Sequence, residues 1–114
     1  MTGYELAQKV AKIALEKKAI DVKIVDIKGV SSMCDYFVIA TGSVDQHVKA
    51  ISEHVRKDLS KLKIKPLGYE GQSNMRWVLL DYVDVVVHIF DPATRELYKL
   101  EQLWQDAKIE TVTE

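Results

Sequence analysis

The sequence predicts a protein of the α/β class, a single domain in which helices pack on a mixed β-sheet. Two patterns support this prediction: apolar residues recur at helical spacing in two long segments, and several runs of β-branched residues have the length of strands. The chain has 114 residues, of which 47% are hydrophobic, enough for one core. The expected order of elements is α-β-β-α-β-β-β-α. The domain is expected to span residues 1–108, with a frayed tail at 109–114.

The first half of the chain begins with a predicted helix followed by two strands. Thr2 and Glu5 stand three residues apart before an apolar run, a capping-box pattern that places the helix at 3–18. Residues 21–28 are β-branched and partly alternating, which favours a strand. Residues 36–41 are almost all apolar, so this second strand is expected to be covered on both faces.

A second, longer helix is expected after Gly42. Ser43 is placed to cap it, with Gln46 as the capping-box partner. Pro66 prevents the helix from continuing far. One apolar stripe runs along the whole segment: Val44, Val48, Ile51, Val55, Leu59 and Leu62.

The second half of the chain is expected to form an extended segment, a hairpin and a short helix. Residues 66–71 are the extended segment, and the strands at 76–82 and 84–91 are close enough to form the hairpin. Pro92 begins a turn or takes the first position of a helix. Residues 97–106 are predicted to be a short helix, or a loop followed by a helix.

Composition excludes several classes of function. With 16 Lys and Arg against 17 Asp and Glu, bulk charge does not favour coating of nucleic acid, and no DNA partner is expected. A single cysteine, Cys34, excludes an internal disulfide. No apolar run approaches the ~20 residues of a membrane span, and the mixed charges of the first residues do not form a signal or transit peptide, so a cytoplasmic protein is expected.

Charge is unevenly divided along the chain. Residues 1–65 carry 12 basic and 8 acidic side chains, whereas residues 66–114 carry 4 basic and 9 acidic ones. If the acidic residues of the second half share a face, that face favours a basic partner.

One pattern suggests enzymatic chemistry. Gly42 and Ser43 join a strand to a helix, as at the entry of nucleotidyltransferases, where backbone N–H groups hold phosphate. Such enzymes also need neighbouring carboxylates for a divalent metal. The nearest pair, Asp81 and Asp84, is spaced i,i+3, and residues at that spacing do not share a face of a strand. A turn and helix cap is therefore the preferred interpretation, and a nucleotide-binding enzyme is kept as the alternative.

The histidines do not indicate a metal site. His47 and His54 are seven residues apart, whereas helical metal ligands usually stand four apart. His54 is expected to form a plain surface pair with Asp58. No metal site and no cofactor are predicted.

The aromatic residues of the acidic half predict an interface. On the hairpin, Val78 and Leu80 and then Val85, Val87 and Ile89 form the more apolar face, which is expected to be core. The opposite, mixed face carries Trp77, Asp81, His88 and Phe90. Tyr98 and Trp104 are expected to border it, since large aromatics that are not core residues are often interface anchors.

Three blocks of sequence resemble one known family. They are DYFVIATGS at 35–43, WVLLDYVDVVVHIFD at 77–91 and YKLEQLW at 98–104. In this order they resemble the Iojap-like ribosomal silencing factor family, RsfS, over nearly the whole chain. Val83 departs from the family, which commonly has Gly there, and suggests a differently shaped turn.

The resemblance implies a fold, a function and a partner. The implied fold is a nucleotidyltransferase-like α/β domain without evident catalytic carboxylates. The implied function is repression of translation by binding ribosomal protein fourteen on the large ribosomal subunit, which blocks joining of the small subunit. A homodimer of the free protein is a further possibility. The residues expected to bind the partner are Trp77, Asp81, His88, Phe90, Asp91, Tyr98, Glu101 and Trp104.

Overall fold

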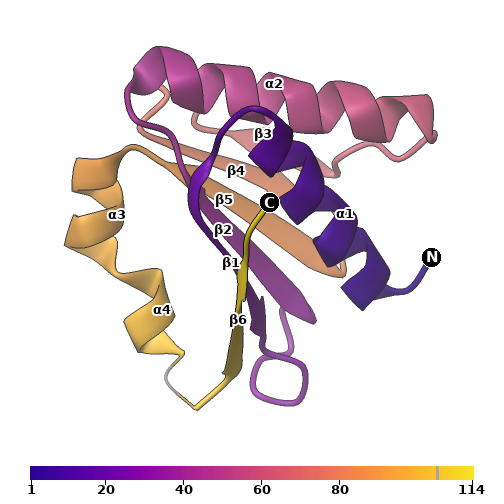
Figure 1. The fold of residues 1–114 in the computed structure, drawn as a ribbon. Coiled ribbons are helices and arrows are strands. Elements are labelled where there is room, and N and C mark those ends of the chain that lie inside the picture. The colour runs from indigo at the N-terminus through magenta and orange to yellow at the C-terminus, as the bar shows by residue number, and fades with distance from the viewer. Residues whose placement is uncertain (105) are drawn as a thin grey trace.

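The computed structural model describes residues 1–104 and 106–114, and it confirms the predicted α/β class with a mixed sheet (Figure 1). The elements are α1 (Gly3–Glu16), β1 (Ile20–Asp26), β2 (Tyr36–Thr41), α2 (Asp45–Lys61), β3 (Gly68–Glu70), β4 (Trp77–Asp81), β5 (Val85–Phe90), α3 (Pro92–Tyr98), α4 (Leu100–Leu103) and β6 (Lys108–Val112). In the described part of the chain, every helix is too short or too polar to cross a membrane.

The sheet has six strands in the order β3-β4-β5-β2-β1-β6. All neighbouring strands are antiparallel except β2 and β5, which run parallel at the centre of the sheet. Each of the six residues of β2 is buried, as the apolar run at 36–41 predicts. The predicted hairpin is also confirmed, since Trp77 pairs with Phe90 and Asp81 pairs with Val86.

Helices α1 and α2 pack on one face of the sheet and form the main core (Figure 1). Thr2 starts α1 with the predicted capping box: its hydroxyl accepts from the Glu5 N–H, and its own N–H donates to the Glu5 carboxylate. The hairpin side chains predicted to be core all face these helices, and each of the five is 0% exposed. They are Val78, Leu80, Val85, Val87 and Ile89.

The segment from α3 to α4 lies on the other side of the sheet and covers a second, smaller core (Figure 1). Asp91 caps α3 by accepting the Thr94 N–H at 2.8 Å, and Pro92 takes the first helical position, where its missing N–H does no harm. Helix formation therefore begins earlier than the predicted 97–106. It is interrupted at Lys99, which adopts a left-handed conformation between α3 and α4.

Two expectations about chain ends and caps are wrong. Residues 109–112 are not a frayed tail, because they belong to β6, which pairs along β1. Over residues 108–111 the charged Lys108 and Glu110 alternate with the β-branched Ile109 and Thr111, a pattern that suits an edge strand. Ser43 does not cap α2 either. The N-cap is Val44, and the Ser43 N–H donates to Nδ1 of His47 at 2.8 Å.

The turn between β4 and β5 keeps the shape that a glycine would favour. Val83 adopts a φ of 74°, and the Asp84 N–H donates to the Tyr82 carbonyl at 3.0 Å. This is a γ-turn of the strained type with positive φ. The expectation that Val83 changes the turn is wrong, since the valine adopts the positive φ that a glycine would favour.

Candidate functional site

The candidate site is the side of the sheet that α3 and α4 cover. Five of the eight predicted partner-binding residues meet there around Phe37 of β2: Trp77, His88, Phe90, Tyr98 and Trp104. The prediction that Trp77, His88 and Phe90 share a face is confirmed, and Tyr98 and Trp104 border that face as expected.

Trp77 is the centre of this aromatic cluster. Its ring lies 4.7 Å from that of Tyr98 and 4.9 Å from that of Phe90, measured between centroids. Its indole N–H donates to Nδ1 of His88 at 3.0 Å. Trp77 is only half-buried, so it joins the internal cluster to the surface.

His88 and Phe90 lie beneath the surface. They are 5% and 1% exposed, so direct contact with a partner is not expected of either in this structure. Burial lowers the pKa of His88 to about 4, because the charged imidazolium loses its hydration there. The ring is therefore neutral near pH 7, and among the described residues its Nε2 has no hydrogen-bond partner.

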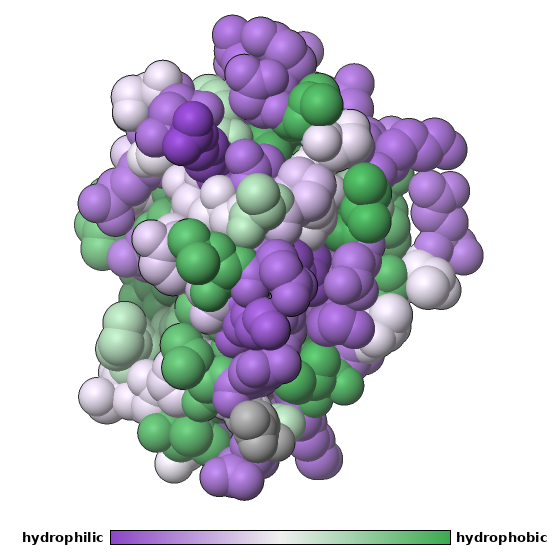
Figure 2. All heavy atoms as spheres, turned by 90° about the vertical axis from the view of Figure 1, so that its left-hand side faces the viewer, coloured by the Kyte–Doolittle hydropathy of each residue, from purple (hydrophilic) through white to green (hydrophobic). Residues whose placement is uncertain are grey.

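The exposed part of the site comes from α3 and α4. Leu97 is 76%, Tyr98 50% and Leu103 70% exposed, while Leu100 and Trp104 pack inward against the second core. Figure 2 shows this side of the molecule, where hydrophobic side chains lie among hydrophilic ones. Exposed leucines and an aromatic side chain on one short segment are the kind of surface that protein interfaces use.

The three acidic residues of the prediction are engaged within the protein and do not form one patch. Asp91 caps α3, and the Glu101 carboxylate lies 2.6 Å from Nη2 of Arg95. Asp81 accepts the Val83 N–H at the opposite end of the hairpin from Asp91. A shared acidic face made of these residues is therefore not what the structure shows.

Arg95 holds the C-terminal segment on the sheet and was not predicted. Its side chain is 10% exposed. Nη1 donates to the Asp21 carbonyl and to the Thr41 hydroxyl, each at 2.7 Å, and Nε donates to Glu101 at 2.8 Å. One guanidinium thus joins α3, α4 and the ends of β1 and β2. The sequence holds no signal for this, because Asp21 and Thr41 are far from Arg95 along the chain.

The features that suggested an enzyme have structural roles. A Cβ on Gly42 would stand 2.6 Å from the backbone N of Val48, so this glycine allows the loop to approach α2 closely. A cavity of about 530 Å³ adjoins this loop. Arg76 lines it together with Asp45 and Asp91, so the lining carries two carboxylates against one guanidinium and does not favour an anion. In the part of the chain that the structure describes, the side chains grouped as metal ligands are Glu16, His54 and Asp58, and neither Asp81 nor Asp84 joins them.

Comparison with known proteins identifies the family. The sequence model described as "Ribosomal silencing factor during starvation", RsfS, matches residues 2–114. The ribosomal silencing factor of Halalkalibacterium halodurans is 38% identical over 107 residues, which cover 94% of this chain and 92% of that protein. A crystal structure of a Chromobacterium violaceum protein superposes with a TM-score of 0.89 at 30% identity, covering 100% of this chain and 95% of the other.

An organelle relative is also similar. The mouse protein named "Mitochondrial assembly of ribosomal large subunit protein 1" is 32% identical over 92 residues, or 78% of this chain and 40% of that protein. The fold and the matches together define the class of this chain, an α/β ribosome-associated domain. The chain belongs to the RsfS family of ribosomal silencing factors, which confirms the resemblance drawn from its three sequence blocks.

Proposed function

We propose that this protein represses translation by binding the large ribosomal subunit through ribosomal protein fourteen and thereby blocking the small subunit from joining. The observation that carries the proposal is membership of the RsfS family over residues 2–114. The name of the mouse relative, which refers to assembly of the large subunit, supports the choice of subunit.

The exposed side chains of α3 and α4 are the docking surface of this proposal. Leu97, Tyr98 and Leu103 are exposed, and they are carried by a segment that Arg95 fixes to the sheet. A rigid support lowers the entropy lost when a surface is immobilised against a partner. The aromatic cluster beneath them supplies that support, because Trp77 contacts Tyr98 from the sheet side.

The proposed mechanism is steric and does not need catalysis. A folded domain that occupies part of the surface where two subunits meet prevents their contact, because two bodies cannot fill the same space. A stable complex of this kind needs a contact of about 800 Å² on each partner. The roles of Gly42, Asp81 and Asp91 within the fold are consistent with a binding protein.

Co-sedimentation tests the choice of partner. The protein is mixed with purified large subunits, small subunits or joined ribosomes and centrifuged through sucrose. We expect it to migrate with free large subunits and not with the other two. Migration with small subunits alone, or with no ribosomal particle, would contradict the proposal.

A double variant tests the surface. Leu97→Ser combined with Leu103→Ser is expected to weaken binding to large subunits by about a hundredfold or more, since burying each leucine contributes at least about 1.5 kcal/mol and every 1.4 kcal/mol is a factor of ten. Leu67→Ser is the matched control, because Leu67 is 78% exposed and lies before β3, at the other end of the sheet. Equal affinities of the double variant and the control would show that α3 and α4 are not the docking surface.

A further inference from the structure

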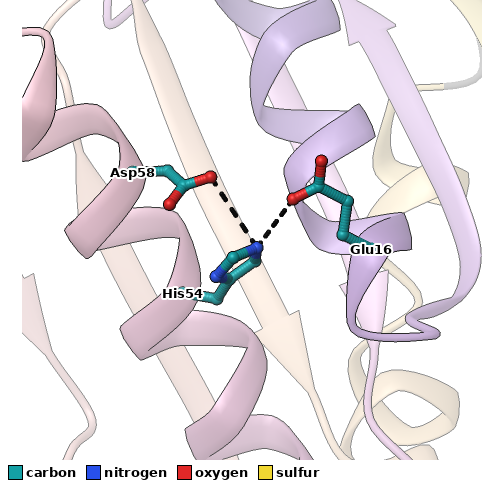
Figure 3. A group of neighbouring side chains, drawn as sticks. All are labelled: Glu16, His54 and Asp58. Carbon is teal, nitrogen blue, oxygen red and sulfur yellow. Dashed lines mark hydrogen bonds and ion pairs between the residues drawn. The ribbon is translucent and has the colours of Figure 1, made fainter.

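Outside the candidate site, one cluster of side chains has the composition of a metal centre. Glu16 of α1 and His54 and Asp58 of α2 turn toward one another between the two helices (Figure 3). Nε2 of His54 lies 2.7 Å from Oε1 of Glu16 and 3.7 Å from Oδ2 of Asp58. Each residue offers one ligand atom, and these atoms all lie within 4.8 Å of one another.

We propose that Glu16, His54 and Asp58 form a binding site for a divalent transition-metal ion, with Zn²⁺ as the best fit. One imidazole nitrogen and two carboxylate oxygens are ligands that zinc accepts at about 2.0–2.2 Å, with a fourth position left for water. Magnesium and calcium prefer oxygen ligands alone, so the histidine favours a transition metal.

The geometry needs only a small adjustment to hold an ion. Ligand atoms around a tetrahedral zinc stand about 3.3 Å apart, given bonds of about 2.0–2.1 Å. Two of the three side chains are already restrained, since His54 is 21% and Asp58 26% exposed. Glu16 is 61% exposed and has free torsions, so it is the ligand that moves away from the imidazole to admit the ion.

The helices around the cluster make it attractive to a cation. Glu16 is the last residue of α1 and Asp58 lies in the last turn of α2. The C-terminal end of a helix carries partial negative charge, and carboxylates there add to it. The last turn of α1 contains no basic residue. Nζ of Lys61 lies 3.6 Å from Oδ1 of Asp58, whereas Oδ2 of Asp58 faces His54. Lys12 and Lys18 line the same surface depression as Glu16.

Calorimetry with zinc chloride on the intact chain tests the site. We expect one zinc ion to bind with micromolar affinity to the wild type. His54→Ala should abolish that binding, while Glu16→Gln and Asp58→Asn should each weaken it by at least about tenfold, since loss of even an outer-sphere partner commonly weakens metal binding to that extent. Glu53→Gln is the matched control, since it removes a carboxylate from α2 next to His54 but outside the cluster, and its affinity should equal that of the wild type.

A second readout separates the metal site from a simple hydrogen bond between side chains. Zinc should raise the melting temperature of the wild type and of Glu53→Gln, and should raise that of Glu16→Gln by less, because the stabilisation by an ion bound to the folded state falls as its affinity falls. With cobalt in place of zinc, the wild type should show the visible absorption bands of a four-coordinate site. Glu16→Gln and His54→Ala should not show these bands. Circular dichroism shows whether each variant is folded, and Glu16 is exposed enough for its substitution to leave the fold intact.

Two results would overturn the proposal. One is a wild type that binds no zinc up to millimolar concentration, which would leave the cluster as a hydrogen-bonded contact that joins α1 to α2. The other is zinc binding that persists in His54→Ala or is unchanged in both carboxylate variants, which would place the ion elsewhere on the molecule.

Discussion

The indole N–H of Trp77 donates to Nδ1 of His88 across two neighbouring strands, at 3.0 Å. Trp77 pairs with Phe90 in the register, and His88 pairs with Leu79, so the contact is diagonal within one face of the sheet. An indole nitrogen only donates, and therefore Nδ1 of His88 must accept. The hydrogen bond assigns the ring proton to Nε2 and holds His88 neutral.

Stability is expected to fall in acid because His88 is buried and neutral. Its pKa is about 4 in the folded protein and about 6.5 in an unfolded chain, so between these values the unfolded state binds the extra proton. The free energy of unfolding should therefore rise from pH 4 to pH 6.5 and then level off with respect to this group. Over this pH range the rise in the free energy of unfolding that is due to His88 amounts to about 3 kcal/mol.

Urea unfolding at a series of pH values measures this effect. His88→Leu is expected to show a smaller dependence on pH between 4 and 6.5 than the wild type, whatever its absolute stability. Identical slopes for the two proteins would show that His88 is already free to take up a proton in the folded state.

The same hydrogen bond predicts the effect of substituting Trp77. Trp77→Phe keeps an aromatic ring but leaves the buried Nδ1 of His88 without a donor, which should lower the free energy of unfolding by about 1–3 kcal/mol. Tyr98→Phe is the control, because Tyr98 is 50% exposed and its hydroxyl makes no side-chain hydrogen bond to the residues that the structure describes, so its effect should stay within about 0.5 kcal/mol. Equal stability of Trp77→Phe and the wild type in urea would contradict the role given to this bond.

Val83 is a position where a smaller residue should stabilise the protein. A β-branched residue at a φ of 74° is strained, and an L-residue in the left-handed region costs about 1–2 kcal/mol. Val83→Gly should therefore raise the free energy of unfolding by about 1 kcal/mol, after allowing for the greater entropy of glycine in the unfolded chain. Val83→Ala retains a Cβ and should gain less. A destabilised Val83→Gly in chemical denaturation would show that the valine side chain contributes more than the strain removes.

Arg95 should control how firmly α3 and α4 are held. Arg95→Ala removes the donors to Asp21, Thr41 and Glu101 and leaves the Glu101 carboxylate partly buried, which should cost about 2–3 kcal/mol. Arg95→Lys keeps the charge but loses the planar guanidinium, so its free energy of unfolding should lie between those of the wild type and Arg95→Ala. Hydrogen exchange should quicken mainly within residues 92–104. Unchanged exchange there would contradict the anchoring role.

The faces of the hairpin could be predicted from the sequence because strand side chains alternate. That alternation separated Val78 and Leu80 from Trp77, and it placed His88 and Phe90 with Trp77. Alternation does not say what covers a face. Phe90 is buried because the C-terminal segment lies over it, and a pattern within one strand carries no information on that segment.

The features that the sequence did not predict depend on contacts between distant residues. Lys108–Val112 is a strand because β1 offers it a free edge, and Arg95 has its role because Asp21 and Thr41 lie beside it. Glu16 joins His54 only after α1 and α2 pack together. Local propensity and residue spacing do not predict these contacts between distant residues. The resemblance of three sequence blocks, in contrast, identified the family.

An assay of subunit joining tests the central proposal most directly. Purified large subunits are saturated with the protein, small subunits are added, and the particles are separated on a sucrose gradient. We predict that the peak of joined ribosomes disappears with the wild type and with Leu67→Ser, and returns with the variant that carries Leu97→Ser and Leu103→Ser. A joined peak that is unchanged while wild-type protein occupies every large subunit would contradict the mechanism.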